Sequence, residues 1–161
     1  MELTGSQLIG DTFSNTGSQS FTGFNPVTGQ PLPTIFYEAT GEEIDRAVAL
    51  ADQAFLQYRK IRGTDKAIFL ETIAEELLEL GPTLIETASL ETALPETRIT
   101  GERGRTVGQL RLFAGLLRDG KWENEITDPA QPERQPLPKP ALRQVQIPIG
   151  PVAVFGASNF P

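Results

Sequence analysis

The residues with the clearest chemical potential are the last ones of the sequence, where an apolar run leads into small residues and one carboxamide. Residues 152–155 (Val-Ala-Val-Phe) are continuously apolar, which is typical of a strand covered on both faces. In open α/β sheets, ligands bind just beyond the carboxyl end of such a strand. Residues 156–158 (Gly-Ala-Ser) would let a flat ligand approach the backbone closely, and Asn159 then presents an amide donor.

An amide NH2 group beside a reacting carbonyl can stabilise a developing oxyanion without titrating. Phe160 would add an apolar wall, and Pro161 would fix the direction in which the chain continues. Asn159 also has a simpler alternative role, which is to cap the next helix or to satisfy a turn. The local sequence alone favours that alternative. The loop also matches neither a Walker phosphate cradle nor the G-x-G-x-x-G fingerprint.

Composition excludes several other chemistries. The 161 residues contain no Cys and no His, which removes disulfides, thiolate nucleophiles, the usual zinc sites and every Ser-His or Cys-His pair. No metal site is predicted. Any catalysis completed by this chain alone would need carboxylates, Lys, Tyr or Ser, and these form no tight constellation in the sequence.

The charge and the hydropathy of the sequence exclude several classes of binding partner. The net charge of -7 argues against binding to nucleic acid or to an anionic membrane, because both require a basic surface. No stretch approaches the roughly 18 apolar residues that cross a bilayer, and the first residues lack the basic and apolar regions of a signal peptide. The predicted compartment is therefore the cytoplasm.

The elements that would position this loop begin with β-hairpins in residues 1–40, where turns are expected at Gly10-Asp11 and in "NPVTGQ". Thr40 and Glu43 then form a capping box. One apolar helical face follows up to about Lys60, and it carries Ile44, Val48, Ala51, Phe55 and Tyr58.

Three further helices are predicted. Thr64 could cap the first, with Ile68, Phe69, Ile73, Leu77 and Leu80 pointing inward until Gly81-Pro82 ends it. The second spans residues 82–93, with Pro82 in its first turn. The third runs from about 97 to 119, with Val107, Leu110, Ala114 and Leu117 on one side. Its five arginines (98, 103, 105, 111 and 118) are expected on a solvated or subunit-facing surface, and an anion site is the alternative.

Five prolines between 129 and 140 exclude a helix there and disfavour a central strand. Residues 121–141 are therefore expected to form an extended arm or linker, and residues 142–147 a half-exposed strand. "PAQPER" also matches a PxxPxR pattern, which aromatic-lined grooves bind as a polyproline ligand.

Four segments in the right order resemble the N-terminal part of the aldehyde dehydrogenase superfamily. They are "FNPVTG", "ATGEEIDRAVALADQAF", "LETALPETRITGERGRTVGQLRLFA" and "PLPKPALRQVQIPIGPVAVFGASNFP". The last two are most similar to the subgroup that contains α-ketoglutaric semialdehyde dehydrogenases and a related NADP-preferring fatty-aldehyde dehydrogenase. The resemblance covers essentially the whole chain.

The resemblance implies an α/β fold in the form of a truncated, N-terminal part of the aldehyde dehydrogenase fold. Residues 1–40 would be N-terminal hairpins, and 41–120 a four-helix segment of the cofactor-binding domain. Residues 121–148 would be a Pro-rich oligomerisation arm with its strand. Residues 149–161 would hold the first strand of the dinucleotide-binding sheet and the oxyanion loop.

The resemblance also implies a function for the intact protein, which is NAD- or NADP-dependent oxidation of an aldehyde through a cysteine thiohemiacetal. Asn159 matches the oxyanion-hole asparagine and Phe160 a wall of the aldehyde tunnel. Phe155, Gly156, Ala157 and Ser158 match the loop beside the nicotinamide. The nucleophilic cysteine, the general-base glutamate and a cofactor-binding lysine would all lie beyond Pro161.

The implied substrate is α-ketoglutaric semialdehyde (2,5-dioxopentanoate), with a long-chain fatty aldehyde as the alternative. The intact enzyme is expected to be a homodimer or homotetramer. By itself, the chain is expected neither to turn over aldehyde nor to bind a dinucleotide tightly. A hypothesis of another class is a non-enzymatic helical module that binds a partner through its proline-rich arm.

Overall fold

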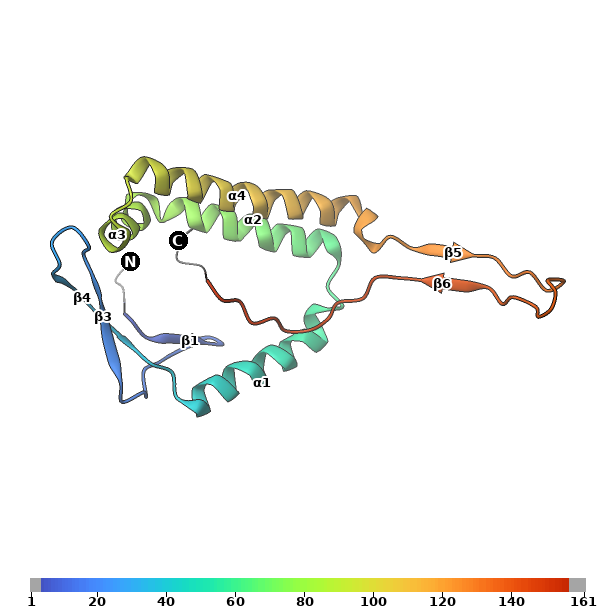
Figure 1. Cartoon of the computed structure of the whole chain (residues 1–161), viewed down its shortest axis with the longest axis horizontal. Helices are drawn as coiled ribbons and strands as arrows, with labels where there is room; N and C mark the ends of the chain where they lie inside the picture. Colours follow the sequence, from blue (N-terminus) through green and yellow to red (C-terminus); the bar gives the residue numbers. More distant parts are fainter. Residues whose placement is uncertain (1–3, 157–161) are drawn as a thin grey trace.

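The structure is a computed structural model that describes residues 4–156, and Figure 1 shows its elements in chain order. Four short strands come first: β1 (Gln7–Ile9), β2 (Thr12–Ser14), β3 (Ser20–Phe24) and β4 (Pro31–Tyr37). Four helices follow: α1 (Gly41–Tyr58), α2 (Gly63–Glu79), α3 (Gly81–Thr92) and α4 (Glu96–Asp119). A short 3-10 helix, η1 (Lys121–Glu123), leads to β5 (Ile126–Asp128) and β6 (Leu142–Gln144). The strands form three separate antiparallel pairs, β1-β2, β3-β4 and β5-β6.

The two N-terminal hairpins form where the turn residues predict them. β1 and β2 pair with Ile9 opposite Thr12, so Gly10 lies in the turn with a φ of 66°. β3 and β4 pair with Phe21 opposite Phe36, and these two rings stack at a centroid distance of 5.6 Å. Cross-strand aromatic pairs of this kind stabilise a two-stranded sheet. The prediction of hairpins in this region is confirmed.

The amino end of α1 is fixed by the predicted capping box. The Glu43 amide donates to Thr40 Oγ1 at 3.2 Å, and the Thr40 amide donates to Glu43 Oε2 at 2.8 Å. Glu43 also ties this helix to the first hairpin, because its Oε1 accepts from the Ser14 hydroxyl and from the Thr16 amide. These donors stabilise the carboxylate form and lower the pKa of Glu43 to about 2.

The apolar face of α1 is not covered by the rest of the described chain. Ile44 and Val48 are 54% and 61% exposed. Only the last turn meets α2, where the Tyr58 ring lies edge-on to Phe69 at a centroid distance of 6.3 Å. The predicted helix is therefore confirmed, but residues 4–156 leave much of its apolar face exposed.

The most extensive helix contact joins α2 and α4, which run side by side in Figure 1. Small residues meet there: Ala67 and Ala74 of α2 are fully buried, as is Ala114 of α4, and Val107 is almost so. Side chains of this size let two helix backbones approach closely. The predicted inner side of α4 is confirmed at Val107 and Ala114.

Two details predicted for α2 are wrong. Arg62, not Thr64, is the N-cap residue, and no side-chain hydrogen bond caps the helix. Ile68 and Phe69 point outward and are 56% and 53% exposed. The face that packs on α4 is set by the alanines, because they permit the closest approach, and Ile68 and Phe69 lie on another side.

The segment after α4 forms an arm. Gly120 ends α4 in the left-handed region at φ 69°, as the sequence predicts. β5 and β6 then project away from the helices as a hairpin (Figure 1). Lys139 Nζ lies 2.5 Å from Asp128 Oδ1 near the base of the proline-rich tip. The extended arm is confirmed, although its returning strand is shorter than the predicted 142–147.

The proline-rich tip does not present the extended conformation of a polyproline ligand. Gln131 and Lys139 form an isolated bridge, with N–H···O distances of 2.9 and 3.0 Å in the two directions. The Arg134 amide also donates to Gln131 O at 3.2 Å. A polyproline II helix has no internal hydrogen bonds. The closed loop therefore contradicts the hypothesis of a proline-rich ligand arm.

The buried strand predicted at residues 152–155 does not form in the described chain. Residues 149–156 have no regular secondary structure, and Val152, Val154 and Phe155 are 67%, 87% and 93% exposed. A strand needs a neighbour to receive its backbone hydrogen bonds. Among residues 4–156, no strand pairs with this segment.

Candidate functional site

The predicted oxyanion and cofactor loop begins at the end of the described chain. Phe155 and Gly156 are both exposed. Ala157, Ser158, Asn159 and Phe160 lie outside the described residues, so their predicted roles stay predictions. The structure thus describes the segment that leads into the candidate site and the elements around that segment.

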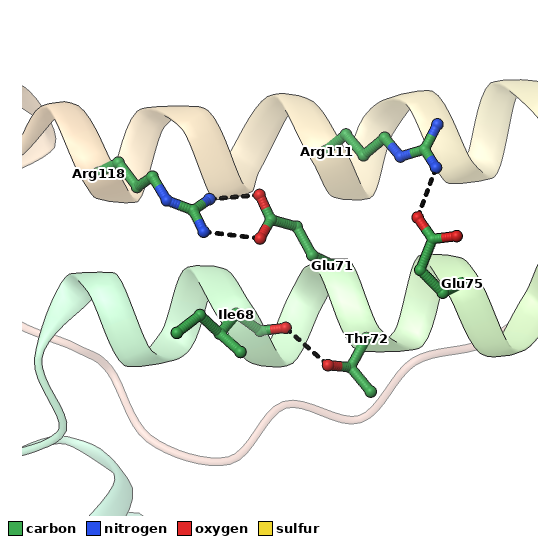
Figure 2. Close-up of polar contacts among 6 residues, drawn as sticks. All are labelled: Ile68, Glu71, Thr72, Glu75, Arg111 and Arg118. Atoms are coloured by element: carbon green, nitrogen blue, oxygen red, sulfur yellow. Dashed lines mark hydrogen bonds and ion pairs between the residues drawn. The ribbon is translucent and has the colours of Figure 1, made fainter.

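Gly150 directs the chain toward the loop. It has a φ of 116°, a conformation that side-chain-bearing residues rarely adopt, and Pro151 follows it. Residues 149–151 nevertheless form neither a turn nor a bend, so the turn predicted at this point is wrong. Beyond Gly150 the chain passes along α2 on the side away from α4, as both Figure 1 and Figure 2 show. Figure 2 places Ile68 and Thr72 on that same side of α2.

The opposite side of α2 is fixed to α4 by two ion pairs, shown in Figure 2. Arg118 binds Glu71 with both terminal nitrogens, and its Nη2 lies 2.6 Å from Glu71 Oε2. Arg111 Nη2 lies 2.6 Å from Glu75 Oε1. The hydrogen bonds from Arg118 lower the pKa of the Glu71 carboxyl. These contacts orient the face of α2 that the segment leading to the site passes.

Other arginines of α4, which were predicted to lie on a solvated or subunit-facing surface, also bind acceptors within the chain. Arg98 Nε donates to Glu102 Oε1 at 2.8 Å, and Arg103 Nη1 donates to the Gly81 carbonyl at 2.9 Å. Arg111 and Arg118 also contact acceptors of this chain. An anion site at Arg111 or Arg118 is disfavoured, because a carboxylate already occupies each guanidinium.

Glu102 is a polar residue that the sequence reasoning missed. Its side chain is only 8% exposed, although α4 carries it one turn after Arg98. An i, i+4 pair of opposite charges is usually a solvated surface feature, so the sequence holds no signal for this burial. Glu102 lies where three helices meet, beside Leu77 of α2 and Leu84 and Ala88 of α3.

Two further observations concern residues 4–156 as a whole. No group of three or more acidic side chains among them could hold a metal ion. None of their helices is both long enough and apolar enough to cross a membrane.

Comparison with known proteins identifies the family. The sequence model of the aldehyde dehydrogenase family matches residues 13–161. The chain belongs to this family. The resemblance found in the sequence is thereby confirmed, and with it the assignment of the α/β chain to the N-terminal part of that fold.

The family's curated members include two that match the entire chain. The chain is 48% identical to alpha-ketoglutaric semialdehyde dehydrogenase 2 of Azospirillum brasilense over 100% of its own length, and it spans 31% of that protein. It is 46% identical to alpha-ketoglutaric semialdehyde dehydrogenase of Acinetobacter baylyi over 99% of its length, spanning 30% of that protein. The chain thus covers about a third of each of these relatives.

Solved aldehyde dehydrogenases share the fold. An NAD-dependent benzaldehyde dehydrogenase from Corynebacterium glutamicum superposes with a TM-score of 0.69 at 17% identity. The superposition covers 81% of this chain and 27% of that enzyme. Similarity at this level of identity establishes the arrangement of the elements and says nothing about the substrate.

Proposed function

We propose that the intact protein carrying this sequence oxidises an aldehyde to a carboxylate with NAD or NADP, in the cytoplasm. The proposed substrate is 2,5-dioxopentanoate and the product is 2-oxoglutarate. The observation that carries the proposal is identity of 46–48% along the whole chain to two proteins named as alpha-ketoglutaric semialdehyde dehydrogenases. The activity is assigned to the intact protein, because the chain spans about a third of those relatives.

Asn159 is the catalytic residue that this chain would contribute. Its side-chain amide would donate to the oxygen of the aldehyde as the carbonyl carbon becomes tetrahedral, which lowers the barrier to nucleophilic attack. Phe160 would line the aldehyde path. We place the nucleophilic cysteine and the general-base glutamate in polypeptide that follows residue 161. A covalent intermediate on that cysteine would divide one difficult step into easier ones.

The chain's contribution to cofactor binding would be the backbone of Phe155, Gly156, Ala157 and Ser158. Gly156 fits this role, because no described atom lies within 4 Å of the position that a Cβ would occupy, and its φ does not require glycine. A glycine at this position would let a flat ligand approach the backbone closely. When bound, the dinucleotide supplies the acceptor for the hydride.

The experiment that tests the substrate compares kcat/KM of the purified intact protein for three aldehydes, by following formation of the reduced nicotinamide. We expect 2,5-dioxopentanoate to be preferred to succinate semialdehyde and to dodecanal. A clear preference for dodecanal would support the long-chain alternative and overturn the proposed substrate. Running each assay with NAD and with NADP determines the cofactor preference.

The β5–β6 hairpin is the proposed contact between subunits of a homodimer or homotetramer. It projects from the helices (Figure 1), and it exposes Ile126, Leu137 and Leu142 by 50%, 68% and 55%. Exposed apolar groups of this kind are typical of association surfaces. Light scattering of the intact protein should show an oligomer that a Leu142→Glu substitution weakens. An unchanged mass at low concentration would argue that the arm is not the contact.

A further inference from the structure

The outer edge of β3 is an open strand edge. The Glu38 amide donates to the Gln19 carbonyl at 3.0 Å, so these two residues form a hydrogen-bonded pair of the β3–β4 hairpin. Such pairs alternate with non-hydrogen-bonded ones along an antiparallel ladder. Ser20 and Thr22 of β3 are therefore non-hydrogen-bonded positions, and their backbone N–H and C=O groups point away from β4. None of these groups has a hydrogen-bond partner among residues 4–156.

The outer edge of β4, in contrast, is covered. The Tyr37 amide donates to the Gly5 carbonyl at 3.3 Å, and the Gln7 side chain donates to the Tyr37 carbonyl at 2.6 Å. The chain passes so close to β4 that a Cβ at Gly5 would collide with the Ile35 carbonyl oxygen. Residues 4–7 thus close one edge of the hairpin and leave the other open.

The sequence of β3 does not protect its open edge. Natural edge strands usually carry charged side chains, especially Lys, or a proline, which discourage another strand from adding. β3 reads Ser-Phe-Thr-Gly-Phe, and residues 12–37 contain no Asp, Glu, Lys or Arg. Ser20 is exposed, and Phe21 is 55% exposed. An edge with these properties is able to accept a further strand.

The edge is complementary to itself, which favours a second copy of the chain as the strand that it accepts. If two β3 strands pair antiparallel about Phe21, Ser20 lies opposite the partner's Thr22, and the two residues exchange both N–H···O bonds. The two Phe21 rings then face one another on the side where each stacks on its own Phe36. The chain has a net charge of -7, but no charged side chain of residues 12–37 opposes this approach.

We infer that two copies of the protein join through their β3 strands, which gives one antiparallel sheet in the order β4-β3-β3-β4. The contact is isologous, since the same residues contribute from both copies. A pairing this short buries little surface, so the association is expected to be weak. The β3–β4 hairpin and the β5–β6 arm lie at opposite ends of the molecule (Figure 1), so the two surfaces are separate. The inference does not depend on the proposed dehydrogenase activity.

Disulfide trapping in the intact protein tests the pairing. In the inferred register the two copies of position 21 form a non-hydrogen-bonded pair, with Cα atoms about 4.5 Å apart. That distance lies within the range of about 4.4–6.8 Å that a disulfide spans. Phe21→Cys should therefore give a linked dimer under mild oxidation at low protein concentration. A non-reducing gel measures the rate of linking, and mass spectrometry identifies the peptides joined at position 21.

Val27→Cys is the matched control, in the turn of the same hairpin. Val27 is 79% exposed, more than Phe21, so random collisions would link position 27 at least as readily. Phe21→Cys should link at least about tenfold faster, since pairing raises the effective concentration of the second thiol. If Phe21→Cys links no faster than Val27→Cys, the β3 strands do not pair and the inference fails.

Two substitutions at Thr22 test the backbone hydrogen bonds. Thr22→Pro removes the outward N–H and keeps the pairing with β4, because that N–H does not point toward β4. Thr22→Ala keeps the N–H. Added to Phe21→Cys, Thr22→Pro should lower the rate of linking to that of Val27→Cys, and Thr22→Ala should leave it nearly unchanged. Urea unfolding verifies that both variants fold. Equal linking by the folded Thr22→Pro and Thr22→Ala variants would contradict pairing through these groups.

Hydrogen exchange of the Ser20 and Thr22 amides in the intact protein identifies any other occupant of the edge. Slow exchange without linking at position 21 would mean that a strand of the same subunit covers β3. Fast exchange without linking would mean that the edge faces water. Either result overturns the inference.

Discussion

Replacing Gly63 by alanine should destabilise the chain, although alanine is the better helix former. Gly63 is the first residue of α2 and lies against the carboxyl end of α4. A Cβ added there would stand 2.7 Å from the Leu117 carbonyl oxygen, which belongs to the α4 backbone. Because a backbone oxygen cannot rotate away, α2 and α4 would have to separate locally.

The magnitude follows from comparison with Gly108→Ala. Gly108 lies within α4, and nothing comes within 4 Å of the Cβ that alanine would add. Gly108→Ala should therefore stabilise the chain by about 0.8–1 kcal/mol, the usual difference in helix propensity. Overpacking costs about 1–3 kcal/mol, so Gly63→Ala should be less stable than Gly108→Ala by at least about 1–3 kcal/mol.

Urea unfolding followed by the fluorescence of Trp122, the sole tryptophan, measures this difference. Its indole nitrogen is 3.9 Å from the Cβ position of Gly63, so the reporter lies at the perturbed contact. With a urea m-value of about 2 kcal/mol/M, the two midpoints should differ by roughly 0.5–1.5 M. The reasoning is refuted if Gly63→Ala unfolds at the same or a higher urea concentration than Gly108→Ala.

Three further predictions concern the α2–α4 contact, the α1 cap and the candidate site. Ala74→Leu should destabilise the chain by about 1–3 kcal/mol, because the fully buried Ala74 has no room for three more carbons; an unchanged urea midpoint would contradict the packing. The pKa of Glu43 is about 2 in the folded state against 4.5 normally, so its contribution to stability is present above about pH 4.5 and is lost as pH falls toward 2. Glu43→Gln should therefore flatten the decrease in urea midpoint over that pH range, and an identical decrease in both proteins would exclude this role. Asn159→Ala in the intact protein should lower kcat about 10²–10³-fold in steady-state and pre-steady-state assays, whereas unchanged turnover would remove Asn159 from the oxyanion site.

Much of the local structure could be predicted because its causes lie close together in the chain. The capping box at Thr40 and Glu43 needs only residues three positions apart, and the structure contains both of its backbone hydrogen bonds. The stop at Gly120 needs only a residue that tolerates a positive φ. The turn at Gly10 likewise joins two strands of three residues each.

The candidate site was predicted by a different route. The local chemistry left two roles possible for Asn159, an oxyanion donor or a helix cap. Only the resemblance of four ordered segments to one family favoured the oxyanion donor. The family match confirms the resemblance over residues 13–161. The position of the Asn159 amide lies outside the described residues, so its role is still a prediction.

The sequence by itself determined the hairpins, the four helices and the arm, because periodicity, caps and turn residues act over a few positions. It determined the family through the resemblance of four ordered segments. Only the tertiary structure decided which apolar residues are covered. The α2 alanines pack on α4 while Ile68 stays exposed, and Glu102 is buried at a position where the pattern predicts a solvated pair. The physical reason is that burial depends on how closely two elements distant in sequence can approach, and no local pattern contains that distance.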